Sequence, residues 1–167
     1  MNPNCTKAKI LEGCQKMTEI DSKEIQQLYQ KKICGWNIGD AAKFAEPYSE
    51  DADFIGFDGT HLEGKQQIIT FHAMLFDKFV KGTRLVGKVK HIRFPTSTVA
   101  IVIGISGTIE SGHDSINPER NSIHTIVAVK TGYKWKFSSF QNTRAQYVGS
   151  PEKIDVLTNE LKQLIQS

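Results

Sequence analysis

The sequence has no long hydrophobic run. Its longest uninterrupted apolar segment is Val99–Ile105, whereas a helix that crosses a bilayer needs about 20 such residues. The first residues also lack an apolar block before a small-residue cleavage site, so we expect no secretory signal. Cysteine is scarce: Cys5, Cys14 and Cys34 are an odd number without metal-like spacing. We therefore predict a cytoplasmic protein with free thiols and no membrane partner.

Positive charge is not concentrated anywhere in the sequence. The formal net charge of +3 comes from scattered residues, with short clusters at Lys31-Lys32 and around residues 88–93. A nucleic-acid-binding protein usually gathers basic residues on one face and adds aromatic side chains that stack on bases. We therefore interpret the charge as a solvated surface and expect no nucleic-acid partner.

Motifs for cofactors and metals are also missing. No Gly-x-Gly-x-x-Gly follows a strand pattern, since Gly104 and Gly107 lie inside one. The histidines show neither His-x-His nor His-Glu-x-x-His spacing. They are His61, His72, His91, His113 and His124. We expect no cofactor and no metal ion.

The patterns that are present predict one domain. At 167 residues the chain is long enough to bury a sizeable core, and it has no internal repeat or linker. Residues 1–20 lack a clean period, and we interpret them as an N-terminal arm, loosely attached, or as a short helix. We assign residues 21–147 to the main domain. Residues 148–167 form a C-terminal amphipathic helix that packs on the same or a partner subunit.

Three helices are expected before the longest strands. Apolar residues at helical spacing predict a helix over residues 22–36, capped at Asp21. Asp40 begins a short second helix. A third helix covers residues 64–79 with an apolar stripe and stops at Gly82.

Strand patterns fill most of the remaining chain. They cover residues 52–57, 60–63, 83–94, 99–110, 122–129 and 134–144. Asp58-Gly59 signals a hairpin turn, and the polar segment 112–121, which contains Pro118, is interpreted as a mobile loop. This order favours an α+β fold in which an antiparallel sheet curls over the third helix.

Short segments spread over residues 22–145 carry a resemblance to a known family. They are Trp36–Asp40, Tyr48–Phe54, Asp58-Gly59, Glu63-Gly64, Ile68 with His72, Thr83–Leu85, Val99–Val102, His124-Thr125, Trp135–Phe137 and Gln141–Arg144. Their order resembles the nuclear transport factor 2-like superfamily, most closely its SnoaL-like branch of the SgcJ/EcaC type. The resemblance implies a cone-shaped, curved antiparallel sheet wrapped around a long helix, a cystatin-like α+β barrel with a pocket between sheet and helix.

The resemblance does not imply one reaction. The superfamily includes isomerases, cyclases, dehydratases, binding proteins and kinase association hubs. In its steroid-isomerase relatives a general-base aspartate stands where this chain has Gly56. Glycine has no side chain that accepts a proton, so that mechanism is not carried over.

His72 and Asp53 are the candidate catalytic residues. His72 lies on the apolar stripe of the third predicted helix, and an imidazole of pKa about 6.5 can act as general acid or base. The alternative is a core histidine bonded to the sheet. Asp53 interrupts an apolar strand and could pair with His72 or Arg93. The alternative is a structural hydrogen bond near the strand's edge.

The candidate ligand-binding residues come from the strands. A turn at Thr131-Gly132 puts His124 and Gln141 on one sheet face, and Asn142 on the other. One face lines the pocket and the other a dimer interface. We favour His124 and Gln141 for the pocket and keep Asn142 as a candidate for either role.

Arg93, Trp36 and Tyr48 complete the candidate ligand-binding set. Strand alternation gives Arg93 the same face as Leu85, where it could clamp an anionic ligand. The alternative is an exposed arginine at a strand end. Trp36 and Tyr48 flank the pocket mouth in the resemblance, and their alternative role is core packing.

The sequence leaves two functions open. The first is a cofactor-independent cyclase, isomerase or lyase that acts on a small apolar molecule. The second is a non-catalytic ligand-binding or association module. As partners we expect a small-molecule ligand and a second copy of the chain, in a homodimer formed through the sheet.

Overall fold

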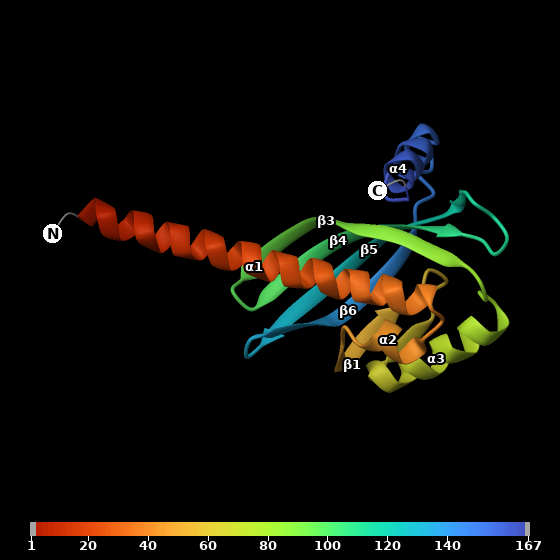
Figure 1. Cartoon of the computed structure of the whole chain (residues 1–167), viewed down its shortest axis with the longest axis horizontal. Helices are drawn as coiled ribbons and strands as arrows, with labels where there is room; N and C mark the ends of the chain where they lie inside the picture. The colour runs from red at the N-terminus through yellow and green to blue at the C-terminus, as the bar shows by residue number, and fades with distance from the viewer. Residues whose placement is uncertain (1–2, 166–167) are drawn as a thin grey trace.

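The computed structural model describes the backbone of residues 3–165 and the side chains of residues 17–165. Four helices and six strands follow one another in this part of the chain, and Figure 1 shows their arrangement. They are α1 (Pro3–Asn37), α2 (Ala41–Ala45), β1 (Tyr48–Ile55), β2 (His61–Glu63), α3 (Gly64–Lys78), β3 (Arg84–Thr96), β4 (Val99–Ile109), β5 (Ile116–Thr131), β6 (Lys134–Arg144) and α4 (Glu152–Lys162). None of these helices is both long and apolar enough to cross a membrane.

The six strands form one sheet in the order β2-β1-β6-β5-β4-β3. Strands β3 to β6 pair antiparallel with their chain neighbours, as predicted, and β1 pairs antiparallel with β2. β1 pairs with β6 in parallel, however, so the sheet is mixed and open, neither wholly antiparallel nor closed as a barrel. Hairpins carry local turn signals, whereas the pairing of β1 with β6 joins distant segments and has none. The α+β class with a long helix against a sheet is confirmed.

Helix α1 is longer than the sequence predicted. It begins at Pro3 instead of residue 22, and its N-terminal part extends beyond the sheet (Figure 1). Asp21 therefore caps nothing. It lies inside the helix, where its carboxylate accepts hydrogen bonds from Lys130 Nζ and Trp135 Nε1. Good helix formers such as Lys, Glu, Gln and Ala continue the helix through a stretch without an amphipathic pattern. The division into an arm and a main domain at residue 20 stays a prediction.

The sheet packs against α1 as well as α3. Helix α1 contacts β3 and β6, whereas α3 contacts β1 and β2. Tyr29 of α1 is fully buried against the sheet. Its ring fills the space above Gly104, where an added Cβ atom would lie 2.6 Å from the ring, and its hydroxyl lies over Gly87. Strand glycines thus allow the helix to approach the sheet closely.

Helix α4 covers part of the outer sheet face. Leu157 and Leu161 pack with Ile105, Ile109 and Ile116 in a second apolar cluster. The C-terminal helix therefore packs on its own chain. Because β5 begins at Ile116, the second half of the segment predicted as a mobile loop is a strand with a buried apolar side chain.

Substitution of Gly104 by alanine tests the close approach of α1. The added methyl group would clash with the buried Tyr29 ring, and we expect the free energy of unfolding to fall by about 1–3 kcal/mol. Chemical denaturation followed by circular dichroism measures this change. In a Tyr29→Leu background the ring is absent, so the same substitution should cost much less. An equal cost in both backgrounds would contradict this packing.

Candidate functional site

A cavity of about 340 Å³ lies between the helices and the concave face of the sheet. Much of its wall is apolar: Trp36, Phe44, Phe54, Leu62, Phe71, Leu75, Phe79, Val80, Leu85 and Phe140. Polar side chains complete it: Lys32, Asp58, Thr60, His72, Ser106, Thr108, Arg120, Ser122, His124, Asn142 and Arg144. A hollow in which polar groups converge between apolar walls is the usual form of a small-molecule site.

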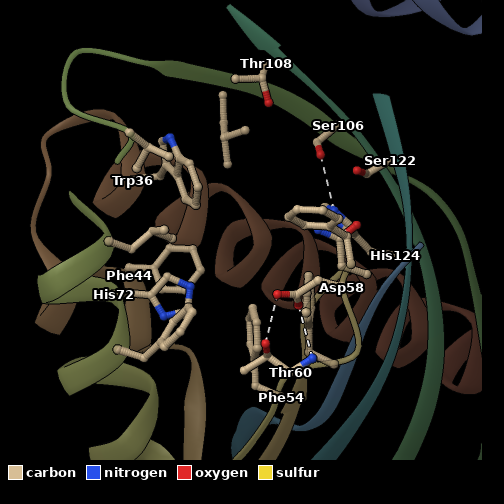
Figure 2. A pocket seen from close by; sticks show the side chains of 18 of the residues that line it. Trp36, Phe44, Phe54, Asp58, Thr60, His72, Ser106, Thr108, Ser122 and His124 are labelled. Carbon is tan, nitrogen blue, oxygen red and sulfur yellow. Dashed lines mark hydrogen bonds between the residues drawn. The ribbon is translucent and has the colours of Figure 1, made fainter. Parts of the chain in front are cut away.

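Helix α3 places His72 in the wall of this cavity (Figure 2). Its ring is buried and stacks on Phe44 with centroids 4.1 Å apart. Its Nδ1 lies 2.8 Å from the carbonyl oxygen of Ile68. Because a carbonyl only accepts, Nδ1 carries the proton of the neutral ring and Nε2 keeps a lone pair. Burial lowers the pKa of His72 to about 4, so the ring is neutral at pH 7.

His124 of β5 lies on the opposite wall of the cavity (Figure 2). Its Nδ1 is 2.9 Å from the Tyr29 hydroxyl, and its Nε2 is 3.2 Å from the Ser106 hydroxyl. The Tyr29 hydroxyl donates to the carbonyl oxygen of Ile105 at 2.9 Å. Nδ1 therefore donates to Tyr29, and Nε2 accepts from Ser106. Burial holds the pKa of His124 well below its usual range. Both ring nitrogens of His124 are thus satisfied by the fold.

Lys32 is a cavity residue that the sequence interpretation missed. The pair Lys31-Lys32 was assigned to a solvated surface, but only Lys31 is exposed and Lys32 is buried. A signal was present, because Lys32 lies three residues after Tyr29 and four before Trp36, on the same helix face. This position of a charged residue on the apolar stripe of a helix favours a functional role over a solvated surface.

The Lys32 amine has no carboxylate partner. Its Nζ lies 4.7 Å from the ring centroid of Phe140 and 5.2 Å from that of Tyr29. Over the described part of the chain, no hydrogen bond or ion pair reaches it. Burial lowers the pKa of Lys32 from 10.5 to about 7, so the neutral amine is well populated near neutral pH.

The β5–β6 register differs from the predicted one. A β-bulge shifts the ladder by one residue between Val127 and Ala128, so His124 lies opposite Asn142. Gln141 is exposed on the outer face and does not line the cavity, so its predicted place beside His124 is wrong. Asn142 lines the cavity, and its Oδ1 is buried without a hydrogen-bond partner. One inserted residue inverts the alternation beyond it.

Arg93 is displaced from the cavity by a similar irregularity. The β3–β4 ladder shifts between Val89 and His91. Leu85 therefore faces the core, whereas Arg93 lies opposite Ile101 and is exposed on the outer face. The prediction that Arg93 shares the face of Leu85 and clamps a ligand there is wrong.

Asp53 does not enter the cavity either. Strand β1 turns Phe54 inward, so Asp53 points outward, where it is exposed. Its Oδ1 lies 2.7 Å from Nε2 of His61 on β2. The predicted pairing of Asp53 with His72 or Arg93 does not occur, and the alternative of a structural hydrogen bond holds.

Trp36 and Tyr48 have different positions. Trp36 lines the cavity, and its Nε1 donates to Thr83 Oγ1 at 3.1 Å. Tyr48 is fully buried and does not line the cavity, so it has the core-packing role. Its ring packs edge-on against Phe54 and Phe137.

The described residues offer no set of metal ligands. Within residues 17–165, no three His, Cys, Asp or Glu side chains gather where they could hold a metal ion. The carboxylate in the cavity wall, Asp58, is occupied by hydrogen bonds from the backbone and hydroxyl of Thr60.

The fold and the cavity define an α+β domain with a pocket, and comparison with known proteins shows that its fold is cystatin-like. No family model and no curated protein matches the sequence. A domain of unknown function with a cystatin-like fold from Nostoc punctiforme is 33% identical, with a TM-score of 0.75 over 89% of this chain and 98% of the other. The chain belongs to the same family of cystatin-like domains, and its sequence motifs resemble the nuclear transport factor 2-like superfamily.

More distant structures share the fold alone. An NTF-2-like protein of unknown function from Shewanella oneidensis is 17% identical, with a TM-score of 0.63 over 74% of this chain and 98% of the other. The hexachlorocyclohexane dehydrochlorinase LinA-type3 from Novosphingobium barchaimii is 13% identical, with a TM-score of 0.67 over 78% of this chain and 90% of the other. These similarities establish architecture and not a reaction.

Substitution of Lys32 by methionine tests the buried amine. The unfolded chain binds more protons than the folded one between the folded pKa of about 7 and the ordinary 10.5. The destabilisation by Lys32 is therefore complete below pH 7 and disappears as the pH rises through 10.5. We expect Lys32→Met to increase the free energy of unfolding by a few kcal/mol below pH 7, and progressively less at alkaline pH.

Urea denaturation at several pH values measures this effect. Lys31→Met is the matched control, because Lys31 is exposed and should show no such gain. A Lys32→Met protein that is no more stable than the original below pH 7 would contradict the claim that the buried Lys32 amine destabilises the folded state.

Proposed function

We propose that this protein is a cofactor-independent enzyme of the cyclase, isomerase or lyase type that moves protons on a small, mainly apolar molecule, with His72 as the proton acceptor. The observation that carries the proposal is the Nε2 atom of His72. It holds a lone pair in the wall of an apolar cavity, and no described protein group bonds it. A base positioned in this way is available to a bound molecule.

The surroundings of His72 suit a proton shuttle. Its Nδ1 is anchored to Ile68, so the ring orientation and tautomer are set before a ligand arrives. Because the pKa is about 4, an imidazolium formed during a reaction is more acidic than an ordinary imidazolium and returns its proton readily to the product. Such a base suits reactions that remove and replace a proton within one site.

The comparisons are compatible with this proposal. The dehydrochlorinase of Novosphingobium barchaimii has the same fold, so an enzyme can be built on it. At 13% identity its reaction and substrate do not transfer to this chain. The enzymatic function therefore rests on the cavity and on His72. The cytoplasmic location stays a prediction from the sequence.

The alternative proposal is a dimeric association or ligand-binding module. Beyond the cover of α4, the outer faces of β4 and β5 carry half-buried apolar residues such as Ile101, Ile103 and Val127. Ile101 lies directly opposite Val127, so these side chains adjoin across the sheet. A partly apolar sheet face is suited to a second copy of the same chain.

Substitution of His72 by glutamine tests the enzymatic proposal. The purified protein is incubated with a cell extract, and mass spectrometry follows which metabolites are consumed. Loss of the base should reduce the rate for any consumed metabolite by about a hundredfold or more. His61→Gln is the matched control, because the same change at an exposed imidazole leaves the cavity intact.

Two outcomes would change the assignment. A folded His72→Gln protein with the original rate would show that His72 is not the base. A metabolite that is retained and released unchanged, with none consumed, would favour the binding module.

Substitution of Ile103 by lysine tests the dimer. A charge on the outer face would be buried on association, so we expect the original chain to be dimeric and Ile103→Lys to be monomeric at the same concentration. Light scattering after size-exclusion chromatography measures the mass. Val148→Lys is the control, because Val148 is an exposed apolar residue outside the strands. A monomeric original chain would end this proposal.

A further inference from the structure

The cavity contains an amine that no described protein group neutralises. Lys32 Nζ is bordered by the rings of Phe140, Tyr29 and Phe44, with centroids at 4.7, 5.2 and 5.6 Å. The side chain is 2% exposed and lines the cavity. A structural lysine normally reaches solvent or a carboxylate. Lys32 reaches neither, so its buried position calls for a role in which the neutral amine is used.

We propose that Lys32 captures a small carbonyl compound, an aldehyde or ketone with an apolar chain, as an imine in this cavity. This inference rests on the proposed function, because it names the substrate class of the same site. A desolvated lysine in an apolar pocket is a recognised nucleophile toward carbonyl carbon. The aromatic walls would hold the apolar chain while the carbonyl carbon meets Nζ.

The reaction balances without an oxidant, reductant or further reactant. The Nζ lone pair forms a bond to the carbonyl carbon, and the π electrons of the C=O bond move to the oxygen. One proton passes from nitrogen to oxygen, which gives a carbinolamine. The C–O bond then breaks, the second nitrogen proton leaves with the oxygen as water, and the nitrogen lone pair closes the C=N bond.

The groups around Lys32 are compatible with these proton transfers. His72 on α3 and His124 on β5 are close enough that the Lys32 charge lowers the pKa of each. His124 is fully hydrogen-bonded, whereas Nε2 of His72 is free to relay a proton from nitrogen to oxygen. The buried phenol Tyr29 stays neutral, because burial raises its pKa. The carboxylate of Asp58 is held by Thr60.

The test is reductive trapping with hexanal as the probe. The full chain is incubated with limiting hexanal and sodium cyanoborohydride at pH 7, and peptide mass spectrometry locates hexyl groups on lysines. The neutral-amine fraction of Lys32 exceeds that of an ordinary lysine, so we expect Lys32 to be labelled about a hundredfold faster than Lys31. The expected rate rises to half its plateau near the folded pKa of about 7.

Variants separate the cavity amine from other lysines. Lys32→Met should lose the fast labelling, whereas Lys31→Met should retain it. Leu75→Trp, which narrows the cavity from α3, should slow labelling of Lys32 and leave exposed lysines unchanged. Equal labelling of Lys31 and Lys32 in folded protein, or no labelling of Lys32, would overturn the inference.

The same experiment distinguishes this inference from the proposed function. Fast labelling of Lys32 with no metabolite turnover would support imine formation at Lys32 and contradict the proposed enzymatic function. Turnover that depends on His72, together with an unreactive Lys32, would support the proposed enzymatic function and contradict imine formation at Lys32.

Discussion

The position of helix α1 and of the cavity residues beside it depends on the contact of Tyr29 with the sheet. Its ring occupies the space left by the missing side chain of Gly104, and its hydroxyl bonds the Ile105 backbone and His124. Residues three or four apart share a helix face, so this contact also directs Lys32 into the cavity. A helix held further from the sheet would leave that amine nearer solvent and would leave Nδ1 of His124 without its hydrogen-bond acceptor, the Tyr29 hydroxyl. The fold and the chemistry of the cavity therefore share one packing constraint.

Burial without a neutralising partner sets the protonation states of Lys32 and His72 in the cavity. Lys32 and His72 are both buried, and neither has a carboxylate beside it. Each is therefore poised toward its neutral form, which is the nucleophilic or basic one. A solvated or ion-paired arrangement would stabilise the protonated groups and remove that reactivity. The free energy that the fold loses by burying these groups is consistent with a functional site.

The local patterns predicted most elements but not the side of the sheet that each residue takes. Turn signals and alternation located β3, β4 and β6 closely, and the apolar stripe placed His72 in the cavity wall. Alternation failed for Gln141 and Arg93 for one reason: each follows a β-bulge that reverses the facing of the residues beyond it. A bulge depends on how two strands are held together by the whole sheet, so a single strand sequence does not reveal it.

By itself the sequence determined the α+β class and the order of the elements, because periodicity, caps and turns act over a few neighbouring residues. Short motifs spread along the chain carried the resemblance to a family. Only the tertiary structure decided that β1 pairs in parallel with β6, that Asn142 replaces Gln141 beside His124, and that Lys32 lies buried among aromatic rings in the cavity wall. These features depend on which distant surfaces meet. Burial and the pKa shifts it causes exist only after those surfaces have packed.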